Sequence, residues 1–232
     1  MNKEQFIKAI EELGVENGIE KFSLLETYYD LLVEWNEKIN LTAITEREEV
    51  YLKHFYDSLT LVKVVNLKEI ESFCDIGTGA GFPGIVIKIF YPHIKLTLVD
   101  ALNKRINFLD IVVKTLKLEH VTLVHARAEE YALKNREKFD IVTARAVAPL
   151  NILLEYSLPL VKVNKYFIAM KGNEDVTQSK NSLEILKGKI VKKCEFLLPI
   201  ENSQRTIIEI KKTAITPKKY PRRYAEIKKR PL

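Results

Sequence analysis

The 232-residue sequence has only two cysteines, no long apolar run and no internal repeat. Cys74 and Cys194 cannot build a disulfide framework, so we expect a reduced, cytoplasmic protein. No apolar run approaches the roughly 20 residues of a membrane-spanning helix, and the first residues open an amphipathic stretch rather than a secretory signal. The four histidines lack metal-ligand spacing. These absences argue against a membrane protein or a disulfide scaffold, and they predict no metal site.

Positive charge is present but unevenly distributed. The formal net charge is +6, and the segment 211–232 holds nine Lys and Arg residues against one acid, Glu226. Two interpretations are open: a solvated, loosely ordered tail, or an arm that binds a polyanion. Tyr220, Pro221 and Tyr224 lie between the cations, and aromatic faces beside cations suit nucleic acid. The candidate RNA contacts in this arm are Lys218, Lys219, Arg222 and Arg223.

The first 66 residues have the pattern of helices. Apolar residues fall on one helical face at Phe6, Ile7, Ile10 and Leu13. Two capping-box patterns, residues 23–26 (SLLE) and 45–48 (TERE), predict helix starts at Ser23 and Thr45. We expect three parts in the chain: a helical cap over residues 1–66, a cofactor-binding domain over 67–211 and a basic arm over 212–232.

Seven short β-rich runs predict a sheet. Five of them alternate with helical stretches such as 104–117 and 149–161, which is typical of a parallel sheet covered on both faces. The last two runs are separated by too few residues for a parallel crossover, so they should pair antiparallel. The runs are 72–76, 95–99, 121–124, 140–143, 166–170, 190–197 and 205–210. The expected fold is α/β and Rossmann-like: a mostly parallel seven-stranded sheet with a C-terminal antiparallel strand pair and an N-terminal helical extension.

A glycine-rich turn follows the first run. Residues 74–84 read CDIGTGAGFPG, which contains the G-x-G-x-x-G pattern from Gly79 to Gly84. Glycine permits positive φ and close approach of a ligand to the backbone, and such a turn between strand and helix receives adenosine-containing cofactors. Asp100 follows Gly79 by 21 positions, where its carboxylate can accept hydrogen bonds from ribose hydroxyls. This pattern suits nicotinamide and S-adenosylmethionine cofactors equally.

Three features favour S-adenosylmethionine. Asp75 precedes the turn, where it would attract the ammonium of the methionine part and repel a pyrophosphate. The chain has no room for a separate substrate domain, which a dehydrogenase usually carries, and the closing antiparallel pair departs from a plain doubly wound sheet. A nicotinamide-dependent oxidoreductase remains the first alternative. A non-enzymatic RNA-binding protein of the same fold is the second, and the intact Asp75, Gly77, Gly79 and Gly81 argue against it.

Five motifs closely resemble the glucose-inhibited division protein B family. They are residues 35–44 (WNEKINLTAI), 54–59 (HFYDSL), 75–84 (DIGTGAGFPG), 144–150 (ARAVAPL) and 169–172 (AMKG). The resemblance implies a class I methyltransferase that uses S-adenosylmethionine to methylate ring nitrogen 7 of one guanine in 16S ribosomal RNA, near the decoding region. The implied partner is that RNA, either free or within an assembling 30S subunit, and we expect a monomer.

The resemblance also implies roles for individual residues. It places Gly77 and Phe82 at the methionine side of the cofactor, Asp100 at the second strand end, Ala128 and Glu129 at the adenine, and Arg145 on the cofactor side after the fourth strand. Arg145 is the candidate positioning residue, because ligands bind at this edge of open α/β sheets; a plain salt bridge is the alternative. Further candidate phosphate contacts are Lys104, Arg105 and Lys171.

The chemistry of ring nitrogen 7 agrees with what the sequence lacks. This nitrogen carries a free lone pair and no proton, so its methylation needs no general base, and in-line alignment with the methyl carbon and sulfur supplies most of the rate. The motif ARAVAPL stands where exocyclic-amine methyltransferases carry Asn/Asp-Pro-Pro-aromatic. We expect Cys74 and Cys194 to be core thiols rather than nucleophiles. We expect His54 to pack against a helix or to cap one, with a place near the substrate cleft as the alternative.

Overall fold

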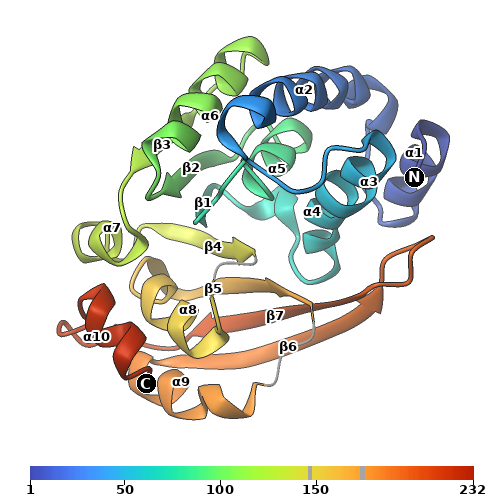
Figure 1. Cartoon of the computed structure of the whole chain (residues 1–232). Coiled ribbons are helices and arrows are strands. Elements are labelled where there is room, and N and C mark those ends of the chain that lie inside the picture. Colours follow the sequence, from blue (N-terminus) through green and yellow to red (C-terminus); the bar gives the residue numbers. More distant parts are fainter. Residues whose placement is uncertain (146–147, 173–175) are drawn as a thin grey trace.

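The predicted sheet is present, and its strand order creates a place for a ligand. The computed structural model describes residues 1–145, 148–172 and 176–232. Within these residues seven strands lie in the order β3-β2-β1-β4-β5-β7-β6 (Figure 1). The strands are β1 Ser72–Ile76, β2 Lys95–Asp100, β3 Val121–His125, β4 Phe139–Arg145, β5 Val161–Lys171, β6 Gly188–Leu197 and β7 Gln204–Lys212. The chain order reverses between β1 and β4, and ligands bind at such a switch point.

The pairing of the strands confirms the sequence prediction. Strands β1 to β5 pair in parallel, whereas β5 pairs with β7 and β7 with β6 in antiparallel register. The antiparallel register sets Ala169 opposite Ile208 and Cys194 opposite Ile207. The last strands therefore close the sheet as a hairpin, with β6 at its outer edge.

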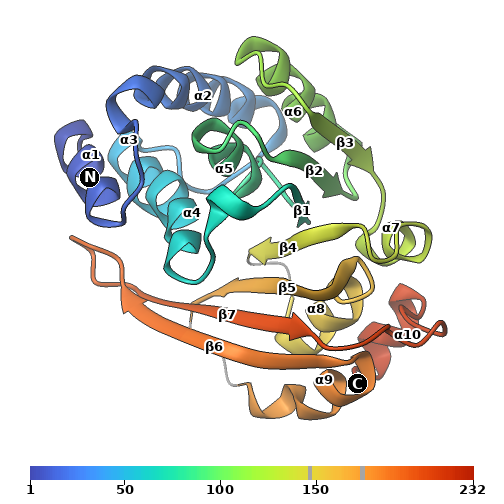
Figure 2. The same ribbon diagram turned by 180° about the vertical axis from the view of Figure 1, so that it is seen from behind.

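Helices cover both faces of the sheet (Figure 2). The N-terminal helices, α5 and α6 share one apolar cluster with one face, and α7 to α10 share a second cluster with the other. On β1, Phe73 belongs to the first cluster and Cys74 to the second, as strand alternation requires. The helical cap and the sheet thus have a common core. Among the described residues, no helix combines the length and apolar character needed to cross a bilayer.

Helices of very different length connect the strands and form the N-terminal cap. They are α1 Lys3–Glu12, α2 Gly18–Ile39, α3 Arg47–Val50, the π-helix η1 Tyr51–Tyr56, α4 Asp57–Leu59, η2 Thr60–Lys63, η3 Leu67–Glu69, α5 Gly84–Phe90, α6 Asn103–Thr115, α7 Ala128–Lys134, α8 Leu150–Ser157, η4 Thr177–Ser179, α9 Lys180–Leu186 and α10 Tyr224–Lys229. The stretches 104–117 and 149–161 predicted as helices correspond to α6 and α8.

Both predicted helix starts in the cap are wrong. Ser23 lies inside α2, which begins at Gly18, because the buried face that includes Leu25 already starts at Gly18 and continues at Phe22. For the next helix the N-cap is Glu46, whose carboxylate accepts a hydrogen bond from the Glu49 N–H at 3.1 Å. A carboxylate near a helix N-terminus satisfies free N–H groups as a hydroxyl does, so the helix begins one residue later than the Thr45 prediction requires.

The basic arm is folded against the domain rather than extended. Tyr220 and Ile227 are buried in the second apolar cluster, and the Arg136 guanidinium donates to the Tyr220 carbonyl. Arg222, predicted as an RNA contact, donates to Glu155 through its backbone N–H, Nε and Nη2 at 2.7–2.9 Å. The Glu155 side chain has no exposed surface. Arg222 therefore neutralises a buried carboxylate, and its assignment as an RNA contact stays a prediction.

Replacing Arg222 should destabilise the fold. Arg222→Ala leaves the buried Glu155 without its partner, and removing one member of a buried ion pair costs about 3 kcal/mol or more. The matched control is Arg223→Ala, since Arg223 is exposed and should change the unfolding free energy by less than about 0.5 kcal/mol. Urea unfolding measures both. Equal stability of the two variants would contradict the assigned role of Arg222.

Candidate functional site

The glycine-rich turn forms a pocket at the carboxyl ends of the parallel strands. Gly77 and Gly79 have φ values of 64° and 62°, in the left-handed region that favours glycine. A Cβ built on Gly79 would meet no atom within 4 Å, so the turn is open there. This hollow, the loop pocket, has a volume of about 250 Å³. Its lining residues are Leu41, Thr42, His54, Gly77, Thr78, Gly79, Ala80, Phe82, Arg105 and Arg145.

Asp75 braces the turn from behind. Its Oδ2 accepts hydrogen bonds from the Thr78 hydroxyl at 2.7 Å and from the Gly84 N–H at 3.0 Å, so it joins the two ends of the turn. The side chain is completely buried, and its Oδ1 has no hydrogen-bond partner among the described residues. Burial raises the pKa of Asp75 to about 7. Direct contact between Asp75 and a ligand ammonium stays a prediction.

Asp100 lies beside the turn, as its spacing predicts. Its Oδ2 accepts from the Gly79 N–H at 2.9 Å, and its Oδ1 accepts from the Leu102 N–H at 2.9 Å. The Arg105 guanidinium also reaches Oδ2, at 3.3 Å. Arg105 lines the loop pocket as the partner of Asp100, and the predicted contact of Arg105 with RNA phosphate stays a prediction. Its Nε is buried and has no hydrogen-bond partner among the described residues.

Of the other predicted cofactor residues, Ala128 and Glu129 lie near Asp100, whereas Gly81 lies outside the lining of the loop pocket. Ala128 and Glu129 begin α7, just after β3, and the Ala126 N–H donates to the Asp100 carbonyl at 3.1 Å, so they share the edge that carries Asp100. Glu129 is buried, which raises its pKa. Gly81 does not line the loop pocket. A Cβ on Gly81 would come within 2.7 Å of the Tyr28 hydroxyl, so this glycine serves packing.

A tyrosine from α2 holds the turn from the other side. Tyr28 is fully buried and donates its hydroxyl hydrogen to the Ala80 carbonyl. Its ring packs against Phe55 and Phe82, with centroid separations of 5.6 and 5.3 Å. Tyr28 was not predicted as a site residue. The structure adds a polar contact that ties the helical cap to the turn.

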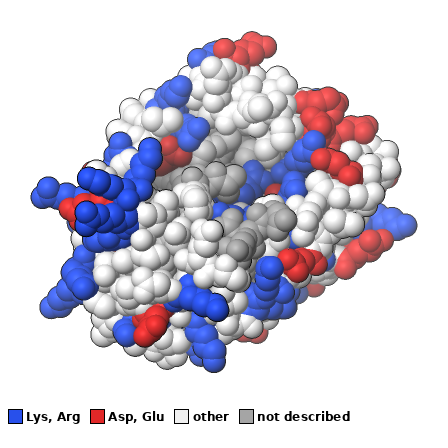
Figure 3. All heavy atoms as spheres, turned by 60° about the horizontal axis from the view of Figure 1, so that its bottom comes forward, with Lys and Arg blue, Asp and Glu red and all other residues white. Residues whose placement is uncertain are grey.

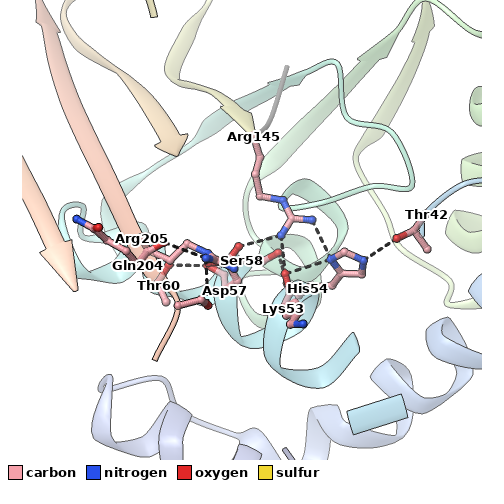
Figure 4. Close-up of polar contacts among 10 residues, drawn as sticks. Thr42, Lys53, His54, Asp57, Ser58, Thr60, Arg145, Gln204 and Arg205 are labelled. Carbon is pink, nitrogen blue, oxygen red and sulfur yellow. Dashed lines mark hydrogen bonds and ion pairs between the residues drawn. The ribbon is translucent and has the colours of Figure 1, made fainter. Parts of the chain in front are cut away.

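Arg145 belongs to a network centred on Asp57 (Figure 4). The Arg145 Nη1 donates to Asp57 Oδ2 at 3.0 Å and to the Lys53 carbonyl at 2.9 Å. On the other side of the carboxylate, the Arg205 Nε donates to Oδ1 at 3.1 Å. Asp57 is only 4% exposed. Neither Asp57 nor Arg205 was predicted as a site residue, although Asp57 lies within the motif HFYDSL.

His54 lies beside Arg145 at the wall of the loop pocket. Its Nε2 is 3.0 Å from the Thr42 hydroxyl, its Nδ1 is 3.2 Å from an Arg145 nitrogen, and its ring stacks on Phe82 at 4.5 Å. Burial, followed by the Arg145 charge, lowers the pKa of His54 to about 3, so the ring is neutral at physiological pH. His54 packs in the cap as expected and lines the loop pocket, whereas a place near the substrate stays a prediction.

A second hollow adjoins the loop pocket. This outer pocket, of about 300 Å³, shares His54 and Arg145 with the loop pocket. Lys171, a predicted phosphate contact, lines the outer pocket and donates to the Ala148 carbonyl. Two residues of the predicted ARAVAPL motif, Ala146 and Val147, lie outside the described residues.

The remaining predicted RNA contacts are exposed. They are Lys104 at the start of α6, and Lys218, Lys219 and Arg223 in the folded arm. The face turned forward in Figure 3 is hollowed near its centre and has Lys and Arg atoms at the margins of the hollow. Of the two cysteines, Cys74 is fully buried with a raised pKa and Cys194 is half-buried on β6, and neither lines either pocket.

Comparison with known proteins identifies the family. A family model described as "GidB: rRNA small subunit methyltransferase G" matches residues 21–207. The chain belongs to this family. A protein named ribosomal RNA small subunit methyltransferase G from Bacillus thuringiensis (strain Al Hakam) is 50% identical, and the alignment covers 100% of this chain and 99% of the relative. A protein of the same name from Exiguobacterium sibiricum is 46% identical over 100% of both chains. The motif resemblance is thereby confirmed.

Solved structures of low identity share the class I methyltransferase fold. The structure titled "StiE O-MT" superposes with a TM-score of 0.59 at 13% identity, covering 81% of this chain and 82% of that chain. TYW2 of M. jannaschii, solved in complex with AdoMet, superposes with a TM-score of 0.52 at 15% identity, covering 62% of this chain and 70% of that chain. At such identities the likeness shows the fold alone.

The groups that line the loop pocket of this GidB-family chain are of the kinds that S-adenosylmethionine requires. The open space beside Gly79 allows a ligand to approach the backbone. The unpartnered Nε of Arg105 would be satisfied by a ligand oxygen. The Asp100 carboxylate accepts from three donors of the protein, namely the Gly79 N–H, the Leu102 N–H and the Arg105 guanidinium. A carboxylate has about four acceptor positions, so one is left for a ribose hydroxyl.

A substitution at Gly79 should abolish cofactor binding. In Gly79→Val the branched side chain would occupy the open space and resist positive φ, so we expect the Kd for S-adenosylmethionine to rise at least tenfold, about 1.4 kcal/mol. Calorimetry on the folded variant measures this. Gly14→Val is a matched control, because Gly14 also has positive φ (77°) and open space but lies outside the loop pocket. Unchanged affinity in Gly79→Val would contradict the assignment.

The raised pKa of Asp75 should appear in the pH dependence of stability. The folded state binds the Asp75 proton more tightly than the unfolded chain, whose carboxyl has its ordinary value of 3.8. The resulting stability is fully present below about pH 4 and is lost as pH rises through about 7. Asp75→Asn removes this titration. The unfolding free energy of the variant relative to the wild type should therefore increase with pH over this window, by at most about 1.4 kcal/mol per pH unit.

Urea unfolding at pH 4.5, 6 and 8 tests this expectation. His54 titrates in the opposite sense, because its lowered pKa costs stability as pH falls below its ordinary 6.5. Its contribution is common to both proteins and cancels in the difference. Asp110→Asn, at a half-exposed surface ion pair, is the control. A pH-independent difference for Asp75→Asn would show that the carboxyl titrates normally.

Proposed function

We propose that this protein transfers a methyl group from S-adenosylmethionine to ring nitrogen 7 of one guanine in 16S ribosomal RNA, near the decoding region. The observation that supports this most directly is the junction of two pockets at His54 and Arg145. A methyl transfer needs adjoining sites for donor and acceptor, because the two must meet in line. The printed names of the relatives support the ribosomal substrate.

The residues of the loop pocket would hold the cofactor. Gly77 and Gly79 offer their backbone, Asp100 would accept from the ribose, and Phe82 with Arg145 would border the methionine side. Ala128 and Glu129 would meet the adenine. When bound, S-adenosylmethionine supplies an electrophilic methyl group on a sulfonium. The protein contributes a rigid frame, because the turn is fixed by Asp75 on one side and Tyr28 on the other.

The groups at the junction suit a nucleophile that carries no proton. His54 is neutral, and the Arg145 guanidinium beside it disfavours proton uptake. The Asp57 carboxylate is engaged by two arginines. Neither group is poised as a general base, and ring nitrogen 7 requires none. Arg145, held by Asp57 and by the Lys53 carbonyl, acts as a positioning residue between the two pockets.

Two alternative functions have separate tests. Family membership argues against the nicotinamide-dependent oxidoreductase, and titration with each cofactor would distinguish the two enzymes. A non-enzymatic RNA-binding protein would bind 16S RNA without altering it.

Mapping of 16S RNA methylation in a strain that lacks the gene tests the proposal: one 7-methylguanine should disappear and should return when the gene is restored. An unchanged methylation map would refute the proposed function.

The protein would act in the cytoplasm as a monomer, and mass analysis in solution checks the oligomeric state.

The chemical step should be nearly independent of pH. With saturating cofactor, the single-turnover rate of methyl transfer should stay flat from about pH 6 to 9, because no group must lose a proton. Saturation removes any effect of the Asp75 titration on cofactor affinity. A rate that rises tenfold per pH unit over part of this range would indicate a catalytic base and would count against attack by ring nitrogen 7.

A further inference from the structure

The outer pocket has walls that differ from those of the loop pocket. Four apolar side chains line it, namely Ile44, Met170, Phe196 and Ile207. The polar part of the lining includes Asp57, Arg145 and Arg205. Apolar walls with a few convergent polar groups are typical of small-ligand sites, and a volume of about 300 Å³ is at the lower end of their range.

We propose that the outer pocket receives the target guanosine after it has left the RNA stack, with the base against the Phe196 ring and a backbone phosphate at Arg205. The proposal rests on the proposed function and adds to it the binding place of the acceptor. A base inside a helix cannot enter such a hollow, so the nucleotide must be extruded, as in other enzymes that act on bases. The shared residues His54 and Arg145 then bring the base to the cofactor.

Phe196 is the aromatic residue of this pocket and is held in place. It lies on β6, directly opposite Arg205 on β7. The Lys63 ammonium lies 5.0 Å from the centroid of its ring. A cation over one side of an aromatic ring fixes the ring, and a fixed ring can stack on a base at low entropic cost. The sheet therefore presents a stacking surface and a guanidinium side by side.

Arg205 is positioned and has unused donor capacity. Its Nε is held by Asp57, and its Nη1 donates to Ser203 Oγ at 3.2 Å and to the Gln204 carbonyl at 3.0 Å. Its Nη2 has no hydrogen-bond partner among the described residues. The side chain is 23% exposed, so a phosphate can reach it. The guanidinium is pre-oriented for an anion, which suits phosphate recognition.

The test uses three substitutions in the full-length protein with 30S subunits from a strain that lacks the gene. Phe196→Leu keeps an apolar side chain but removes the aromatic face, and kcat/KM for the RNA should fall at least about fivefold. Phe196→Tyr keeps the face and should stay within about twofold of the wild type. The matched control Leu197→Ala changes the next residue on β6, which is 57% exposed, and should have no effect. The Kd for S-adenosylmethionine should be unchanged in all three.

The outcomes separate the two proposals. If the wild type binds S-adenosylmethionine but methylates no guanine of the subunit, the proposed function fails, and the pocket assignment fails with it. If the wild type is active and Phe196→Leu is equally active, the pocket assignment alone is overturned. Loss of activity in both Phe196→Leu and Phe196→Tyr would also overturn stacking, since it would indicate a requirement for shape only.

Discussion

Two guanidinium groups converge on one buried carboxylate, and the arrangement of both pockets depends on this contact. Asp57 comes from the helical cap, Arg145 from the end of β4 and Arg205 from β7. An unpaired carboxylate at this depth would be strongly unfavourable, so the three segments must come together for the fold to be stable. The triad carries a net charge of +1. This surplus makes the junction of the pockets a favourable place for an anionic ligand.

The cap is therefore part of the site rather than an accessory to it. It supplies His54 and Asp57 at the junction and Tyr28 behind the glycine-rich turn. The π-helix η1 contains His54 and the Lys53 carbonyl that accepts from Arg145. Such helical irregularities are frequent at functional sites. A Rossmann-like sheet alone would have the turn but neither the wall between the pockets nor the partner of Arg145.

The fold could be predicted from the sequence because its signals are local. Strand runs, the short gap before β7 and the glycine-rich turn are each visible within a few residues. The site was predictable only in part, because its contacts join positions 88 and 148 residues apart, and one sequence does not reveal which charges meet. The same limit explains Arg105 and Arg222: their charge was visible, but not the buried carboxylates that hold them. Ser23 failed as a helix start because the apolar face extends upstream of it.

The fixed charges at the junction also bear on the release of the product. Under the proposed chemistry, a unit of positive charge would pass from the sulfonium of the cofactor to the purine ring, with the Arg145 guanidinium between the two pockets. The purine is neutral when it arrives and cationic when it has been modified. In the proposed arrangement Arg205 would attract the phosphate in both states, but Arg145 and Arg205 would repel the ring only in the second. If the outer pocket holds the guanosine as proposed, it would lose affinity for its own product, which would favour turnover over product inhibition.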